Sequence, residues 1–191
     1  RLRQALDDRA PQPAVLASIV ARGPALAARA LQLTNSDFVG RTQPVVSLRE
    51  AVARLGAEGC RVILASVVPV DAEGPMLDEL GRRVTSLARL SAAASTQPEA
   101  AYSAGLLAKL GVLVLAHQTG EGYAAIWARH LSGEPLDACE AALLGHTHAD
   151  VGATLLGLWN LPAALVDAVG LQPAEPFCVP NESVTNAVKL A

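Results

Sequence analysis

The residues best suited to metal or acid–base chemistry gather in the second half of the chain, where all four histidines lie. They are His117, His130, His146 and His148. A zinc or iron site needs three or four converging ligands, and two residues of one helix reach the same ion only at i,i+3 or i,i+4 spacing. His146 and Asp150 have that spacing, whereas His146 and His148 would point to different sides of a helix. We therefore expect Thr147 to cap a helix with Asp150 in its first turn, and metal ligation is the alternative.

The three cysteines give no sign of catalysis or of a disulfide framework. Cys60, Cys139 and Cys178 are far apart and odd in number, which argues against paired thiols. Cys60 and Cys139 lie in apolar helical patterns, and the sequence contains no Gly-x-Ser-x-Gly motif and no glycine-rich phosphate loop. We expect structural cysteines, no catalytic triad, and a reducing, cytoplasmic environment.

Lys109 is the one charged residue of the most apolar segment, GLLAKLGVLVLA, residues 105–116. A buried ammonium group must extend to solvent, pair with a carboxylate such as Glu140, or lose its proton. No cofactor-binding or carbonyl-binding motif accompanies it. We therefore expect Lys109 to reach solvent or an acidic partner rather than to act as a catalytic amine.

Composition excludes several classes of protein. The 191 residues are 51% hydrophobic and 17% charged, as in a globular domain. A net charge of -3 gives no general attraction for nucleic acid or anionic lipid, and Lys109 divides the best apolar run below the length of a membrane span. We expect a soluble protein that binds neither nucleic acid nor membrane. The chain begins with Arg and shows no signal peptide, so we expect a fragment of a longer protein.

Helical periodicity dominates the sequence, and alternating β-branched runs are nearly absent, which predicts an all-α fold. Ser47 and Glu50 form a potential capping box before a helix over 48–55 that Gly56 should end. The polar segment 71–74 is the expected hinge between an N-terminal lobe, residues 1–70, and a second lobe, residues 75–191. Besides a helix from Pro24, the expected helices lie near 75–94, 98–116, 121–131, 136–145, 148–158, 162–169 and 182–190.

The helix, glycine, helix pattern around Gly56 also suggests a helix-turn-helix DNA-binding motif. A recognition helix must present polar side chains to base edges. The second helix here offers only Arg61 and Ser66, so we interpret it as a core helix.

Four segments in order resemble the HDOD family of bacterial signalling proteins, over nearly the whole chain. They are PALAARALQLTNS, SLREAVARLG, AGLLAKLGVLVL, and a final pattern from Glu140 through Gly145, His148 and VGA to WNLP at 159–162. The resemblance implies an HD-like helical bundle with a small N-terminal helical lobe.

HDOD domains are similar to HD-domain metal phosphohydrolases, and that likeness implies where metal ligands would stand. The helix corresponding to 105–111 carries adjacent His and Asp ligands in the hydrolases, whereas this chain has Ala108 and Lys109. Ala has no donor atom, and an ammonium ion repels a divalent cation. An upstream ligand histidine is missing from 75–94, and the positions of a further histidine pair hold Gly170 and Leu171. We therefore expect no metal or other cofactor, and we expect Lys109 to occupy the space of the lost ion.

The resemblance implies a non-catalytic module that acts by protein–protein or interdomain interaction in two-component or cyclic dinucleotide signalling. The partner would be another protein or a fused sensory or receiver domain; the sequence does not specify the oligomeric state. The candidate surfaces are a polar turn with Asn35, Ser36 and Arg41, and the former cleft near Lys109, Glu140 and His148.

Two alternatives stay open. A residual metal-dependent phosphohydrolase would use His146, His148 and Asp150. A nucleotide sensor would bind phosphate through Lys109 in the vacated cleft.

Overall fold

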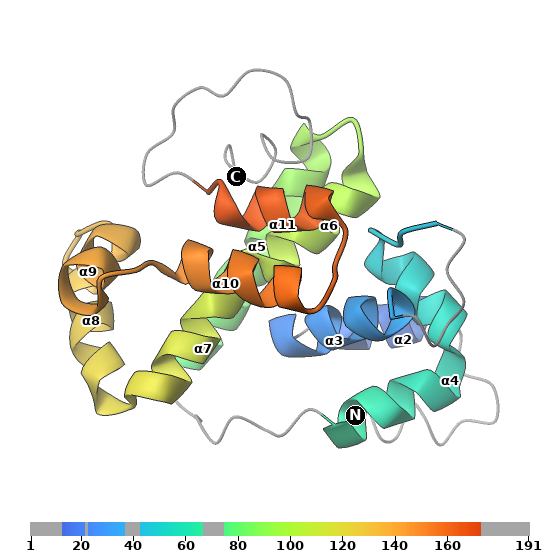
Figure 1. Ribbon diagram of the computed structural model, residues 1–191, viewed down its shortest axis with the longest axis horizontal. Helices are drawn as coiled ribbons and strands as arrows, with labels where there is room; N and C mark the ends of the chain where they lie inside the picture. The colour runs from blue at the N-terminus through green and yellow to red at the C-terminus, as the bar shows by residue number, and fades with distance from the viewer. Residues whose placement is uncertain (1–12, 22, 37–42, 67–74, 173–191) are drawn as a thin grey trace.

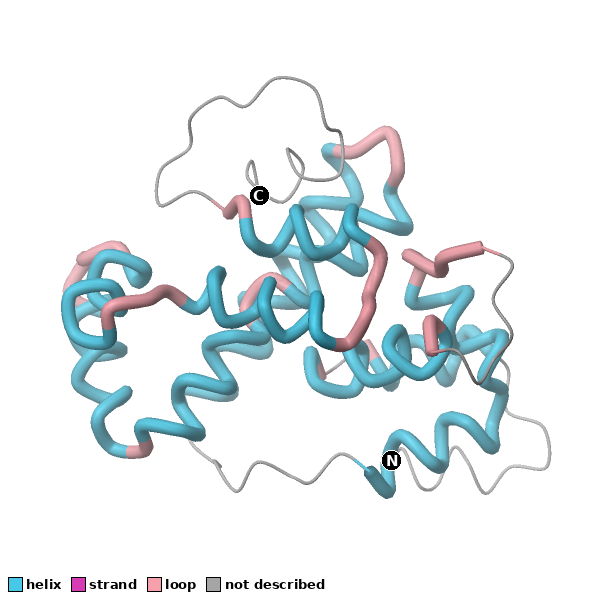
Figure 2. The backbone as a smooth tube through the Cα atoms, in the orientation of Figure 1, coloured by secondary structure: helices cyan, strands magenta, loops and turns pink. Residues whose placement is uncertain are grey.

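Ten helices and no strand make up the described part of the chain, residues 13–21, 23–36, 43–66 and 75–172 of a computed structural model (Figures 1 and 2). The predicted all-α fold is confirmed. The helices are α2 Pro13–Val20, α3 Pro24–Thr34, α4 Leu48–Ser66, α5 Pro75–Ala94, α6 Pro98–Leu107, α7 Leu110–Thr119, α8 Glu121–Leu131, α9 Leu136–Leu144, α10 His148–Leu158 and α11 Ala163–Gly170.

Local sequence signals explain most helix boundaries. Pro24 and Pro98 occupy first-turn positions, where a missing amide hydrogen costs nothing. Gly56 has a φ of 61° and kinks α4, as its position after a helical pattern predicts. Gly145 ends α9 in the left-handed region with a φ of 78°. The expected hinge at 71–74 and the expected helix at 182–190 lie outside the described residues.

The single helix expected over 98–116 is two helices. The chain breaks at Ala108 and Lys109, and Lys109 precedes α7 with φ −108° and ψ 19°. By length and composition alone, Pro98–Thr119 could span a membrane despite Lys109. However, 67% of its apolar window is buried inside the protein, as in many core helices.

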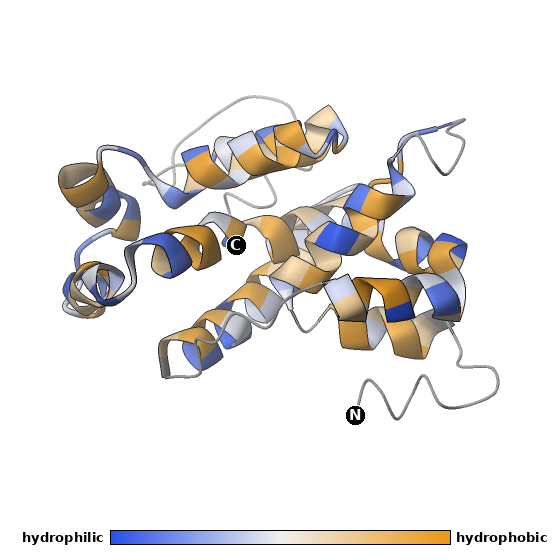
Figure 3. Cartoon of the chain, turned by 60° about the horizontal axis from the view of Figure 1, so that its bottom comes forward, coloured by the Kyte–Doolittle hydropathy of each residue, from blue (hydrophilic) through white to orange (hydrophobic). Residues whose placement is uncertain are grey.

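The helices of the N-terminal part pack on one another and on the rest of the bundle. α2 and α3 lie against α4, while α3 and α4 contact α6, which runs along α5 (Figure 1). Most helices carry both apolar and polar residues around their circumference, as amphipathic helices do (Figure 3). One core cluster extends from Leu16 of α2 to Tyr123 of α8, so the N-terminal and later helices share buried surface.

Two serine hydroxyl groups hold the start of α4, and the buried one, Ser103, ties it to α6. The Ser103 hydroxyl, fully buried, accepts from the Leu48 amide at 2.9 Å and donates to the Glu99 carbonyl at 3.0 Å. Ser47 caps α4 by accepting from the Glu50 amide at 3.2 Å. The Glu50 carboxylate pairs with Arg54, so only the serine half of the expected capping box forms.

α7 and α10 approach each other closely at a glycine. A Cβ atom added at Gly111 would lie 1.9 Å from the carbonyl oxygen of His148 and 3.0 Å from the amide nitrogen of Gly152. Both neighbours are backbone atoms, which cannot rotate away. Only glycine therefore lets α10 approach α7 at this distance.

We predict that Gly111→Ala lowers the free energy of unfolding by about 1–3 kcal/mol, because α7 and α10 must separate. Urea denaturation measures the change. Gly81→Ala is the matched control, since a Cβ at Gly81 of α5 meets nothing within 4 Å and the helix gains propensity. Equal effects of the two substitutions would contradict this account of Gly111.

Candidate functional site

A chain of hydrogen bonds joins Lys109, His148 and Glu140 in the interior between α6, α7, α9 and α10. The Lys109 Nζ atom lies 2.7 Å from His148 Nε2, and His148 Nδ1 lies 2.6 Å from Glu140 Oε2. A carboxylate only accepts, so Nδ1 carries the imidazole proton and Nε2 accepts from the lysine. Lys109 therefore reaches Glu140 through the histidine rather than by direct pairing.

Glu140 is fully buried, with every oxygen supplied with donors. Its Oε2 atom also accepts from the backbone amide of His148 at 2.7 Å, and its Oε1 atom accepts from the Tyr123 hydroxyl. His148 is the first residue of α10, so the carboxylate faces the positive end of that helix. These interactions meet the requirement that a buried charge be paired and fully hydrogen-bonded.

The pKa directions agree with this arrangement. Burial lowers the pKa of Lys109, with Glu140 and Asp137 opposing the effect, and burial lowers the pKa of His148 below its usual value. Burial alone would raise the pKa of Glu140, but the hydrogen bonds from His148 and Tyr123 outweigh it and the net direction is downward. Burial and the adjacent carboxylate raise the pKa of Tyr123. The expected form is a neutral imidazole between an ammonium group and a carboxylate.

The local sequence explains how these side chains meet. Gly145 ends α9 soon after Glu140, and Thr147 begins α10 as its N-cap. Thr147 accepts from the Asp150 amide at 3.2 Å, and the Asp150 carboxylate accepts from the Thr147 amide at 2.9 Å. The predicted cap is thereby confirmed and is a complete capping box. It fixes His148 at the start of α10, beside Glu140.

A hollow of about 450 Å³ opens beside Lys109, along one face of α5. Its lining comprises Glu79, Arg82, Arg83, Ser86, Leu87, Leu90 and Lys109. This basic face of α5 was not predicted from the sequence. The i,i+3 and i,i+4 spacing of Glu79, Arg82 and Arg83 was the available signal.

The other candidate metal ligands do not join this cluster. His146 and His117 are exposed, and His130 contacts Arg83 and the carbonyl of Glu134. Among the described residues, no three His, Cys, Asp or Glu side chains are placed to hold a metal ion. Cys60 and Cys139 are buried, and burial raises the pKa of both thiols.

The polar turn after α3 is held by Asn35, which is buried. Its side-chain amide donates to the carbonyl groups of Leu31 and Val45 at 2.9 Å, and its Oδ1 accepts from the Val45 amide at 2.9 Å. Ser36 is half-buried and donates to the Leu33 carbonyl. Asn35 therefore shapes the turn from within, and Arg41 lies outside the described residues.

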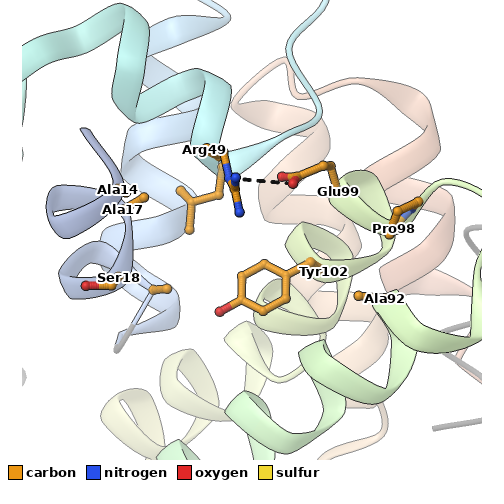
Figure 4. Close-up of a pocket in the computed structure, with 10 residues that line it drawn as sticks. Ala14, Ala17, Ser18, Arg49, Ala92, Pro98, Glu99 and Tyr102 are labelled. Carbon is orange, nitrogen blue, oxygen red and sulfur yellow. Dashed lines mark ion pairs between the residues drawn. The ribbon is translucent and has the colours of Figure 1, made fainter. Parts of the chain in front are cut away.

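A second cavity, of about 390 Å³, lies between α2, α4 and the start of α6 (Figure 4). Alanines such as Ala14 and Ala17 form much of its wall, and the Tyr102 ring projects toward it. Arg49 and Glu99 pair with each other at 3.5 Å beside it. It offers apolar surface but no unbalanced charge.

Comparisons with known proteins identify the fold. The sequence matches the HDOD domain family over residues 1–174. The chain belongs to the HDOD family. A comparison with curated protein sequences gives no match.

Solved structures resemble this HDOD domain. The MmoQ response regulator from Methylococcus capsulatus strain Bath is 25% identical, with a TM-score of 0.71 over 90% of this chain and 73% of that chain. A virulence factor from Campylobacter jejuni is 18% identical, with a TM-score of 0.74 over 97% and 70%. A candidate phosphohydrolase from Shewanella amazonensis SB2B is 23% identical, with a TM-score of 0.54 over 98% and 70%. These likenesses confirm the HD-like helical bundle.

We predict that Glu140→Gln destabilises this HDOD domain by on the order of 3–5 kcal/mol, because a glutamine cannot accept all the donors around it and leaves Lys109 without a counter-charge. Chemical denaturation measures the loss. Glu134→Gln is the control, since that carboxylate pairs with Arg129 near the surface and its replacement should change stability much less.

The lowered pKa of His148 predicts a pH dependence of stability. In the unfolded chain histidine takes up a proton near pH 6.5, whereas the folded protein does so at lower pH. As pH falls below about 6.5, the unfolded state binds more protons and the free energy of unfolding decreases until the folded pKa is reached. Denaturation at about pH 7.5 and about pH 5.5 measures this loss. It should persist in His146→Gln, an exposed control, and shrink in His148→Gln.

Proposed function

We propose that this HDOD domain is a non-catalytic signalling module that acts by binding another protein or a neighbouring domain. The observation that carries the proposal is the contact between Lys109 Nζ and His148 Nε2 at 2.7 Å. In HD-type hydrolases the segment around Lys109 supplies metal ligands. Here a cation from the chain itself engages the one nearby histidine that the resemblance preserves.

The chemistry of the donor atoms supports the absence of hydrolysis. His148 Nε2 accepts from Lys109, and Nδ1 is protonated toward Glu140, so neither nitrogen offers a free lone pair. Both oxygens of Glu140 accept from Tyr123 and His148. Ala108 supplies no donor atom, and an ammonium group beside it opposes a divalent ion. A metal would have to displace this network before it could activate water.

The similarity to the MmoQ response regulator supports a place in signal transduction. Such modules need only two conformations that a partner or upstream signal distinguishes. We infer a cytoplasmic setting in a two-component or cyclic dinucleotide pathway. The surfaces proposed for contact are the turn at Ser36, with Arg41 further along the sequence, and the rim of the cleft near Lys109.

We predict that the purified protein contains no stoichiometric iron, manganese or zinc and releases no product from cyclic dinucleotides. Elemental analysis without chelators and chromatographic product analysis measure both, with an active HD-type hydrolase as the positive control. One metal ion per chain, or turnover that chelators abolish, would contradict the proposal.

The interaction itself is tested with the full-length protein in its native host. Crosslinking followed by mass spectrometry identifies the partner and the contact residues, and the purified partner is then titrated against the domain. Saturable binding to the domain supports the proposal. Crosslinks confined to other parts of the parent protein would contradict it.

A further inference from the structure

The hollow beside Lys109 contains three basic side chains and one carboxylate among its lining residues. Arg82 and Arg83 project from α5, while Lys109 comes from the break between α6 and α7. Basic residues from two different elements thus line one concave surface. Such convergence is what a small anionic ligand requires.

Arg83 is held in place by contacts from two helices. Its Nε atom donates to Glu79 Oε1 at 2.7 Å, and its Nη1 atom lies 3.0 Å from His130 Nε2. The guanidinium carbon lies 5.8 Å from the centre of the Trp127 ring. These contacts orient the guanidinium group before any ligand arrives, which reduces the entropy lost on binding. Its Nη2 atom has no partner among the residues that the structure describes.

Arg82 shares the same carboxylate. Its Nε and Nη2 atoms donate to Glu79 Oε2 at 3.2 and 2.7 Å. One carboxylate therefore serves two guanidinium groups, and its pKa is lowered by the hydrogen bonds from Arg83 and Arg82. This leaves a local excess of positive charge and N–H donors, the features that recognise phosphate oxygens.

The hollow also has an apolar end. Leu87 and Leu90 line it on α5, and Leu90 is 53% exposed. Leu90 follows Arg83 by seven residues, roughly 10 Å along the helix axis. Ser86 lies between them and adds a hydroxyl group to the lining. A charged end and an apolar end at this separation suit a compound with a phosphate group and an organic body.

We propose that this hollow is a binding site for a small phosphate monoester of about mononucleotide size. The phosphate lies between Arg83, Arg82 and Lys109, and the organic body rests on Leu87 and Leu90. This binding site would give the proposed signalling module a small ligand. The inference of the site does not depend on the proposed signalling function.

Titration calorimetry with adenosine 5′-monophosphate tests the site, with inorganic phosphate and adenosine as the two partial ligands. We expect saturable binding of the nucleotide, weaker binding of phosphate, and no binding of adenosine alone. Arg83→Gln should weaken binding about tenfold or more, because a charged hydrogen-bond donor is lost.

Arg54→Gln is the matched control. Arg54 pairs with Glu50 at i,i+4 on α4, as Arg83 does with Glu79 on α5, but it does not line the hollow. Its substitution should leave nucleotide affinity unchanged. Arg82→Gln, at a side chain 70% exposed, provides a second variant if Arg83→Gln unfolds more readily than the wild type.

The proposal is overturned if the wild type shows no saturable binding of nucleotide or phosphate stronger than about 10 mM. Equal losses in Arg83→Gln and Arg54→Gln would also overturn it. Binding of a phosphoserine peptide but not of the nucleotide would assign the surface to a phosphorylated partner instead. Hydrolysis of the bound nucleotide would support the site and contradict the non-catalytic function, so the two failures are distinguishable.

Discussion

The fully buried carboxylate of Glu140 sets the constraint around which the C-terminal helices are arranged. An ionised carboxylate in the interior is costly unless donors surround it, and here the donors come from α8 and α10. Tyr123 and the first amide of α10 each donate a hydrogen bond to the carboxylate. The His148 side chain donates a third and accepts from Lys109, so it connects the carboxylate to the ammonium group. Because the donors belong to Tyr123 of α8 and to His148 at the start of α10, the carboxylate specifies how α8, α9 and α10 meet.

The backbone where α7, α9 and α10 meet also helps to supply donors to the buried carboxylate of Glu140. α10 must bring its first amide to Glu140, and it does so only if it lies close to α7. Gly111 permits that approach, since any side chain there would meet the His148 carbonyl. Gly145 and the Thr147–Asp150 capping box then fix where α9 stops and α10 begins. The hydrogen-bonded chain is therefore a consequence of backbone packing as much as of side-chain chemistry.

Sequence patterns predicted the parts of this arrangement that depend on local rules. The helix start at Pro24, the glycine kink at Gly56 and the cap at Thr147 each depend on a few neighbouring residues, and the structure has them where expected. The short α2 was not predicted, because its eight mostly apolar residues, PAVLASIV, lack a polar face. The break at Lys109 was missed too, since helical propensity continues through it and tertiary packing determines the turn. Lys109 was expected to reach solvent or a carboxylate such as Glu140, but only three-dimensional packing places His148 between Lys109 and Glu140.

The positive charge of this region is divided between an interior and a surface role. In the interior, the positive charge of Lys109 is opposed by the negative charge of Glu140, at the other end of the hydrogen-bonded chain through His148. The interior therefore carries little net charge. Outside, the arginines of α5 share a single carboxylate and keep unused donors toward solvent. A buried balanced network resists change, because removing one member leaves another uncompensated. An exposed excess of donors can instead meet a ligand with little loss of folding stability.

Lys109 lines the hollow and also contacts His148. An anion bound in the hollow would therefore lie beside the residue that contacts His148.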